Sequence, residues 1–202
     1  MNAQGRSQTD VSAAAQVSPR ERILATAAAL FYRRGIQATG IDELAEVAGV
    51  SKRTLYKLFG SKDELVAAYL ERMDEDAVPS ERPLQCLDLP PRDRLLALFD
   101  RPPADAIFRG CPFHNAAVEL AGSAHPAHPV IHAHKHAVLD TIIDAAREAG
   151  ADDPEALGHQ LFVLFEGATA LATSIDSTES FDYARPVAVA LIDQTVPVVD
   201  AA

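Results

Sequence analysis

Signals that start and stop helices follow one another closely between Ser18 and Lys62, and this spacing constrains the fold most. The run SPRE, which begins at Ser18, combines an N-cap serine, a proline suited to the first helical position and a glutamate placed to complete a capping box. Apolar residues then recur on one helical face until Gly35, a residue that favours a helix end. We therefore predict a first helix over Pro19–Arg34.

Two shorter helices with a tight turn between them are predicted next. Thr39 stands three residues before Asp42, which predicts that Thr39 caps a helix of about two turns and that Gly49 ends it. Ser51 is then placed to cap a third helix, Lys52–Phe59, whose inward apolar residues are four positions apart. Two short helices joined by a glycine-containing turn form a helix-turn-helix.

The rest of the chain also carries helical patterns. Ser61 begins another capping box, and the fourth helix that it starts runs from residue 62 to about residue 78, because Pro79 must end it. Beyond a proline-containing linker, 79–91, further helices are predicted at about 92–100, 112–121, 126–149, 154–175 and 183–196. No segment alternates as a strand does, so we predict an all-α fold of about nine helices.

Composition excludes several classes of protein. The hydrophobic fraction, 48%, and the charged fraction, 23%, are ordinary for globular chains. No apolar stretch reaches the roughly 18 residues of a membrane span, and no signal-peptide pattern opens the chain, so we expect a cytoplasmic protein without a membrane partner. Two cysteines, Cys86 and Cys111, cannot form a disulfide framework and are expected to be free thiols.

Charge divides the chain into two unlike parts. The formal net charge is −11, but residues 1–78 carry 10 basic and 11 acidic side chains, so nearly all of the excess lies beyond them. Between Ser18 and Lys62, eight basic residues face only four acidic ones. Such asymmetry indicates that the first part meets a polyanion.

Residues 41–70 read IDELAEVAGVSKRTLYKLFGSKDELVAAYL and follow the run LFYRRG. Together these segments resemble the DNA-binding domain of TetR-type transcriptional regulators. The resemblance covers about 55 residues. It implies a three-helix head, a fourth helix that links head to body, and a larger helical body that dimerises and binds a small ligand. It also implies a sequence-specific regulator, most often a repressor that a small-molecule effector releases from its operator.

The head offers the groups that double-stranded DNA requires. The outer face of the third helix supplies donors for base edges, and arginine is well shaped to contact guanine O6 and N7 together. Helix starts supply backbone N–H groups and a positive dipole end for phosphates. The expected DNA-binding residues are Thr39, Gly40, Ser51, Lys52, Arg53, Thr54, Tyr56, Lys57 and Lys62. Relatives often have a smaller residue where Arg53 stands, so the resemblance does not support a base contact there.

The domain division follows from these patterns. We expect a flexible arm at 1–17, a helix-turn-helix domain at 18–62, a connecting helix at 63–78 and a ligand-binding and dimerisation domain at 79–202. Helices 154–175 and 183–196 are expected to form a four-helix homodimer interface, because small and apolar residues permit close packing about a two-fold axis. Those residues are Ala168, Ala172, Val187, Ala190 and Leu191.

The body contains candidate effector-binding residues. Pockets in helical bundles are mostly apolar with a few polar groups, so a largely apolar effector is expected. The candidates are Phe113, Asn115, Glu119, Phe162, Phe165, Glu166 and Thr169, with Phe108 beside them. The alternative for the phenylalanines is ordinary core. Glu166 stands among apolar residues, and its carboxylate is costly there unless it is paired.

Five of the seven histidines lie between His125 and His136. His125, His128, His132 and His136 share an arc of about 80° that overlaps the arc of Leu139 and Ile143 on the same helix, so they could line a cavity together. Spacings of four residues can chelate zinc or nickel if Cys111, His114 or Glu119 supplies a third ligand. Chance surface histidines and a pH-sensitive patch are the alternatives.

Three further alternatives stay open at this point. A metal-dependent hydrolase would use the histidines with Glu119 as base, but it leaves the helix-turn-helix unexplained. The sequence has no nucleophile elbow, P-loop or dinucleotide fingerprint, so we expect no enzyme and no cofactor. A helical partner-binding module would lack DNA binding altogether. Cys111 is either a buried structural thiol or a redox sensor.

Overall fold

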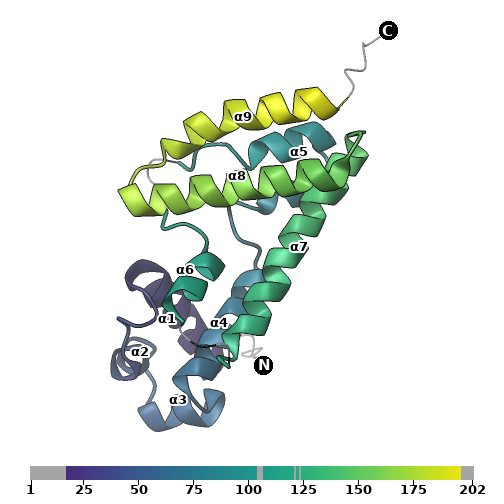
Figure 1. Cartoon of the computed structure of the whole chain (residues 1–202). Coiled ribbons are helices and arrows are strands. Elements are labelled where there is room, and N and C mark those ends of the chain that lie inside the picture. The colour runs from purple at the N-terminus through teal and green to yellow at the C-terminus, as the bar shows by residue number, and fades with distance from the viewer. Residues whose placement is uncertain (1–16, 104–106, 121, 123, 197–202) are drawn as a thin grey trace, which may run out of the picture.

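The computed structural model describes residues 17–103, 107–120, 122 and 124–196, and all regular structure in this part of the chain is helical (Figure 1). The elements are α1 Pro19–Arg34, α2 Ile41–Val47, α3 Lys52–Phe59, α4 Lys62–Glu75, the 3-10 helix η1 Arg82–Gln85, α5 Pro91–Ala97, α6 Pro112–Glu119, α7 Ala127–Glu148, α8 Pro154–Ile175 and α9 Ser180–Thr195. The all-α prediction is confirmed. The expected arm, 1–17, lies almost entirely outside the described residues.

The start of α1 matches the prediction, but the start of α2 does not. Ser18 accepts a hydrogen bond from the Glu21 amide, and the Glu21 carboxylate accepts one from the Ser18 amide, which completes the capping box. The N-cap of α2 is Gly40 and not Thr39. Thr39 precedes this N-cap and is fully buried, and its hydroxyl donates to the Gly35 carbonyl at 2.8 Å, which stabilises the turn after α1.

Helix α3 has the predicted bounds and cap. The Ser51 hydroxyl accepts from the Thr54 amide at 3.0 Å, and Leu55 and Phe59 are buried. The turn before α3 is held from α1 by Arg22, whose guanidinium donates to the Ala48 carbonyl at 3.1 Å and to the Gly49 carbonyl at 3.4 Å. The two helices of the helix-turn-helix are therefore fixed relative to α1.

Helix α4 ends at Glu75, three residues before the predicted end at Val78. Asp76 is its C-cap and accepts from the Arg72 guanidinium at 2.8 Å, and Ala77 adopts a left-handed φ of 56°. Pro79 disfavours a helical conformation at Val78, so the helix ends before the predicted residue. The short helix η1 then lies within the predicted proline-containing linker, 79–91.

The body helices match the prediction closely except at three ends. Helix α5 ends at Ala97, before the predicted residue 100, and α6 ends at Glu119, whereas its predicted end at residue 121 lies outside the described residues. Helix α9 begins at Ser180, earlier than the predicted Tyr183, so Pro186 lies inside the helix and not in its first turn. Helix α8 has the predicted bounds.

Two hydrophobic cores hold the described residues together. One core joins α1–α4 to α6 and to the start of α7, where it ends at Ile131. The other joins α5, α8 and α9 to the rest of α7, beginning at Val138. Figure 1 shows α7 running from the layer of α5, α8 and α9 down to the group formed by α1–α4, with α6 between them. Helix α7 therefore connects both cores.

Candidate DNA-binding surface and ligand cavities

The outer face of α3 presents polar side chains to solvent. Lys52, Arg53, Tyr56 and Lys57 are exposed and Thr54 is half-buried, while Leu55 and Phe59 point into the core. This arrangement matches a recognition helix, which must pack through one face and offer hydrogen-bond donors on the other.

Local contacts position the first turn of α3. The Lys52 ammonium lies 2.8 Å from the Asp42 carboxylate of α2, and this hydrogen bond raises the pKa of Lys52. Both side chains are exposed, so a phosphate can replace the carboxylate at little cost. The Ser51 and Thr54 hydroxyls lie 2.8 Å apart and hold the helix start.

The remaining expected DNA contacts lie at helix starts, with one difference. Gly40 and Ser51 are the exposed N-caps of α2 and α3, and Lys62 opens α4 as a half-buried side chain whose pKa is lowered by burial. Thr39 is buried with its hydroxyl already bonded, so its side chain is not available to a phosphate. The predicted phosphate contact by Thr39 is corrected on this ground.

The seven candidate effector-binding residues do not surround one cavity. Phe113, Phe165 and Thr169 are buried in the cores. Asn115 and Glu119 line a space of only about 10 Å³ against α1. The Glu166 carboxylate pairs with the Lys135 ammonium at 2.6 Å, and this ammonium also lies 5.8 Å from the centre of the Phe162 ring.

A cavity of about 520 Å³ lies instead between head and body. Its lining comes from α1, the end of α4, the segment that follows α4, the end of α5, the described residues between α5 and α6, and the starts of α6 and α9. The main apolar residues are Ala28, Met73, Val78, Ala97, Leu98, Phe108 and Phe181. Phe108 is the one aromatic candidate from the sequence that borders this cavity. Tyr32 forms one edge, where its hydroxyl donates to the Gly110 carbonyl at 3.1 Å and accepts from the Arg109 amide at 2.9 Å.

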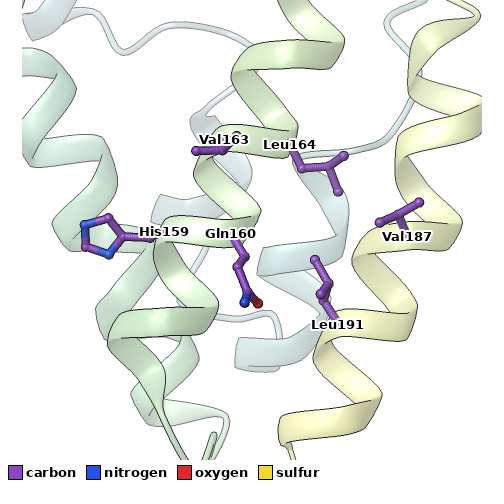
Figure 2. Close-up of a pocket in the computed structure, with 6 residues that line it drawn as sticks. All are labelled: His159, Gln160, Val163, Leu164, Val187 and Leu191. Carbon is purple, nitrogen blue, oxygen red and sulfur yellow. The ribbon is translucent and has the colours of Figure 1, made fainter.

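A second, open groove of about 440 Å³ lies between α8 and α9 (Figure 2). It is lined by His159, Gln160, Val163, Leu164, Val187 and Leu191, and Figure 2 shows Leu164 and Val187 reaching toward each other across it. Apolar side chains continue along this side of the body, where Val163 is 71% and Tyr183 is 76% exposed. Such a continuous exposed apolar face is typical of an interface.

The histidines do not line a common cavity, and that prediction is wrong. His132 and His136 are exposed, and the His128 ring nitrogen lies 2.8 Å from the Gly122 carbonyl. The buried histidine is His134, which was not among the four. Its side chain lies beside Cys111, the one cysteine that is buried, while Cys86 is exposed and both thiols are free.

None of the helices that the structure describes combines the length and the apolar character needed to cross a bilayer.

Comparison with known proteins identifies the family. Residues 23–69 match the family model described as bacterial regulatory proteins, tetR family. The activator FasR of Mycolicibacterium smegmatis is 44% identical over 63 residues, which is 31% of this chain and 29% of that protein. The repressor KstR2 of Mycobacterium tuberculosis is 36% identical over 77 residues, covering 32% of this chain and 38% of KstR2. The chain thus spans less than half of these curated relatives.

Solved structures extend the similarity to almost the whole length. A Streptomyces avermitilis protein assigned to the TetR transcriptional regulators is 37% identical, covers 88% of this chain and 98% of its own, and superposes with a TM-score of 0.78. A TetR-family regulator of Streptomyces coelicolor is 30% identical, covers 89% and 96%, and gives a TM-score of 0.77. These relatives are regulators of transcription and not enzymes, which removes the hydrolase hypothesis. This chain belongs to the TetR family of DNA-binding transcriptional regulators.

Proposed function

We propose that this regulator is a repressor that binds a palindromic operator as a homodimer and leaves it when a small, largely apolar effector binds. The observation that carries the proposal is the exposed polar face of α3, held at a fixed angle by Arg22 and by the Ser51 cap. Arg53, Lys52, Thr54 and Lys57 act on base edges in the major groove.

Phosphate contacts fix the register of α3 on the duplex. The Gly40 and Ser51 ends of α2 and α3 offer backbone N–H groups, Tyr56 offers a hydroxyl and Lys62 a positive charge. Residues 18–62 form the DNA-binding head, 63–78 the connection and 79–202 the ligand-binding and dimerisation part in this proposal.

Dimerisation through α8 and α9 is supported by their exposed apolar face. Val163, Leu171, Tyr183 and Val187 lie on it, and homodimers are typical of the family. Ala168 and Ala172, which were expected in the interface, are instead buried within the chain, because they pack against the body core. Val187, Ala190 and Leu191 keep their proposed role.

The 520 Å³ cavity is the proposed effector site. It contacts α1 and α4 of the head and α5 and α9 of the body at once, so an occupant that fits only one relative position of these parts shifts the equilibrium toward it. Coupling of about 1–3 kcal/mol would weaken operator binding roughly 5- to 150-fold. The residues proposed to contact the effector are therefore Met73, Ala97, Phe108 and Phe181, in place of the seven residues expected from sequence.

Repression is the simpler direction of control for such a dimer. A bound dimer blocks polymerase by occupying the promoter and needs no further partner surface. The names of the relatives include both a repressor, KstR2, and an activator, FasR. Transcription in vitro from a promoter that carries the selected operator distinguishes the two: the proposal requires less transcript with added protein, and an increase would contradict it.

The decisive test is selection of bound sequences from random duplex DNA with the full chain. The expected result is an enriched palindrome whose half-sites are roughly 34–36 Å apart or a multiple of that distance. Binding should weaken steeply as salt rises. A library that shows no enriched sequence and no salt-dependent binding would leave a protein-binding module as the better account. Compounds that raise the melting temperature are then titrated against bound operator, and tight binders that leave operator affinity unchanged would contradict effector release.

A further inference from the structure

A buried polar cluster lies where the segment after α4 meets α6 and α7. Glu81, Cys111 and His134 come from three separate parts of the chain and are 6%, 1% and 3% exposed. A carboxylate oxygen, the thiol sulfur and an imidazole nitrogen of these residues lie within 4.8 Å of one another. Among the described residues, this is the one group of three such side chains whose ligand atoms lie close enough together to hold a metal ion.

Two of these ligand atoms have no hydrogen-bond partner among the described residues. Glu81 Oε1 and His134 Nε2 are both buried and unpaired by hydrogen bonds, and they lie 3.4 Å apart. A buried polar atom without a hydrogen-bond partner destabilises the folded state. Two such atoms facing each other beside a thiol indicate that a further group belongs between them.

The His134 ring is held in one orientation. Its Nδ1 donates to the Asp74 carboxylate at 2.7 Å, and the ring stacks on Phe113 with centroids 3.5 Å apart and an angle of 6°. In the neutral ring a donor at Nδ1 leaves Nε2 with a lone pair, and Nε2 is the nitrogen that lies 3.4 Å from Glu81 Oε1. Carboxylate, histidine and metal form this same chain in many zinc proteins, where the carboxylate fixes the tautomer and raises the basicity of the ring.

We propose that Glu81, Cys111 and His134 bind a Zn²⁺ ion. Thiolate, imidazole and carboxylate are the three ligand types that zinc accepts, and thiolate disfavours Mg²⁺ and Ca²⁺. Ligand atoms roughly 2.0–2.3 Å from a tetrahedral ion lie about 3.3–3.8 Å from one another, which the 3.4 Å separation of Glu81 and His134 already matches. A water molecule or anion completes the tetrahedron.

Surrounding charges support this ion. The Lys135 ammonium donates to Cys111 Sγ at 3.4 Å and to the Glu166 carboxylate at 2.6 Å, so it orients the sulfur without adding net charge. A thiolate and the Glu81 carboxylate together balance the charge of Zn²⁺ when His134 is neutral. The cluster therefore provides three ligands and two orienting contacts, from Asp74 and Lys135.

Two other states compete with this assignment. Without a metal, burial lowers the pKa of His134, but the neighbouring Cys111, Glu81 and Asp74 raise it to about 10, so an imidazolium–carboxylate pair is the state that zinc has to displace. The exposed histidines of α7, among them His132 and His136, also have chelating spacing and could bind zinc on the surface.

Metal binding to the reduced, chelator-treated full chain tests the proposal. Elemental analysis after Zn²⁺ titration and gel filtration should give one ion per chain. Co²⁺ should give thiolate-to-metal absorption and the visible bands of a tetrahedral ion. Zn²⁺ should also raise the melting temperature.

Matched variants assign the ligands. Cys111→Ser, which keeps the size of the side chain, should abolish the thiolate band and weaken Zn²⁺ binding by at least about 100-fold, while Asp74→Asn should weaken it about 10- to 100-fold. Cys86→Ser and His132→Gln should bind like the unmodified chain. Circular dichroism confirms that each variant is folded.

Three outcomes would overturn the site. The unmodified chain could fail to bind Zn²⁺ at micromolar concentration, which would leave the cluster as an ion pair. Binding could survive Cys111→Ser unchanged, or it could be lost in His132→Gln, and either result would move the ion to the exposed histidines.

Discussion

The backbone amide of Gln37, in the turn after α1, donates a 2.9 Å hydrogen bond to the carboxylate of Glu119 at the end of α6. The Gln37 side chain also reaches the Glu119 carbonyl, at 3.5 Å. The head is therefore attached to the body at a second point besides α4. Tyr32 and Arg33 add to this attachment through Gly110 and Arg109.

Removing the Glu119 carboxylate should destabilise the protein. Glu119→Ala leaves the Gln37 amide without its charged acceptor, and we expect the free energy of unfolding to fall by about 1 kcal/mol, because the site is partly open to water. Urea denaturation measures the change. Glu119→Gln keeps an acceptor and should lose less, and Glu71→Ala, at an exposed position of α4, is the control. Equal midpoints for all four proteins would show that the bond contributes nothing.

Arg53 and Lys62 should affect operator binding in different ways. Arg53→Ala removes a base-edge contact, so it should cost about 1–3 kcal/mol on the selected operator and relax the preference at one position. Lys62→Ala removes a phosphate contact, so it should weaken all sequences alike and reduce the salt slope by about one unit. Fluorescence anisotropy on operator and random duplexes at several salt concentrations distinguishes the two. Parallel losses on both duplexes for both variants would mean that these roles are wrongly assigned.

Val163→Asp should separate the dimer. The side chain is 71% exposed in the single chain, so a carboxylate there is tolerated in the monomer but buried without a partner in the proposed interface. That burial costs roughly 3 kcal/mol, about a 100-fold rise in the dimer dissociation constant. Analytical ultracentrifugation measures it. Val118→Asp on α6 is the control, because Val118 is 73% exposed but lies away from α8 and α9. A Val163→Asp protein that sediments as the unmodified chain does would exclude this interface.

Ala97→Phe should block the effector without harming DNA binding. Ala97 lines the 520 Å³ cavity from the body side, and a phenyl ring there takes up space that the effector needs. We expect effector affinity to fall by about 10-fold or more, roughly 1.4 kcal/mol, with operator affinity unchanged. Calorimetry with a compound that raises the melting temperature measures the effector affinity, and fluorescence anisotropy measures the operator affinity. Ala133→Phe, on the exposed side of α7, should leave both unchanged, and unaltered effector affinity in Ala97→Phe would place the site elsewhere.

Gly158→Ala should open the crossing of α7 and α8. A methyl group at Gly158 would lie 2.4 Å from Ile143 Cγ1 and 3.1 Å from Ile143 Cα, so the backbones must move apart. We expect a loss of about 1–3 kcal/mol in the free energy of unfolding. Gly167→Ala on the same helix meets no atom within 4 Å and should gain about 0.5–1 kcal/mol. Both are measured in the Val163→Asp background, which removes contributions from the dimer, and a neutral Gly158→Ala would show that the helices separate freely.

Helix ends that depend on local caps could be predicted from sequence. Ser18 and Ser51 cap their helices as the pattern indicates, and α8 has the predicted bounds, because each cap needs only residues three or four positions away. Thr39 fails although its alternative partner is also local: it lies one residue before the N-cap, and its buried hydroxyl donates to the carbonyl of Gly35, four residues earlier. A local pattern does not reveal whether such a hydroxyl accepts from an amide of the next helix or donates to a carbonyl of the preceding turn.

The importance of His134 was detectable but was missed. Ala127, Ile131, His134, Val138 and Ile142 follow the three- and four-residue spacing of a buried helix face, and all are buried. The sequence prediction compared the histidine arc with the positions of Leu139 and Ile143, which lie at one edge of the buried face. It therefore selected histidines that point away from the core.

The effector cavity had no comparable signal. Much of its wall comes from residues between helices, such as Pro79, Ser80 and Pro103, where no helical period applies. The prediction looked for cavity residues on helices α6 and α8, whose phenylalanines turned out to fill the cores. Only the packing of α1, α4 and α5 around the connecting segments creates this space.

The course of α7 has a consequence for how the protein unfolds. Its first turns belong to the core of the head and its later turns to the core of the body, and the change occurs between Ile131 and Val138. Segments that share a core tend to open as one cooperative unit. The unit that contains the head therefore includes α6 and the beginning of α7, far beyond residue 62. His134 lies at the junction of these two units, so the part of α7 between them is held mainly by the polar contacts of His134 and Lys135 and by the stacking of His134 on Phe113, and not by an aliphatic core.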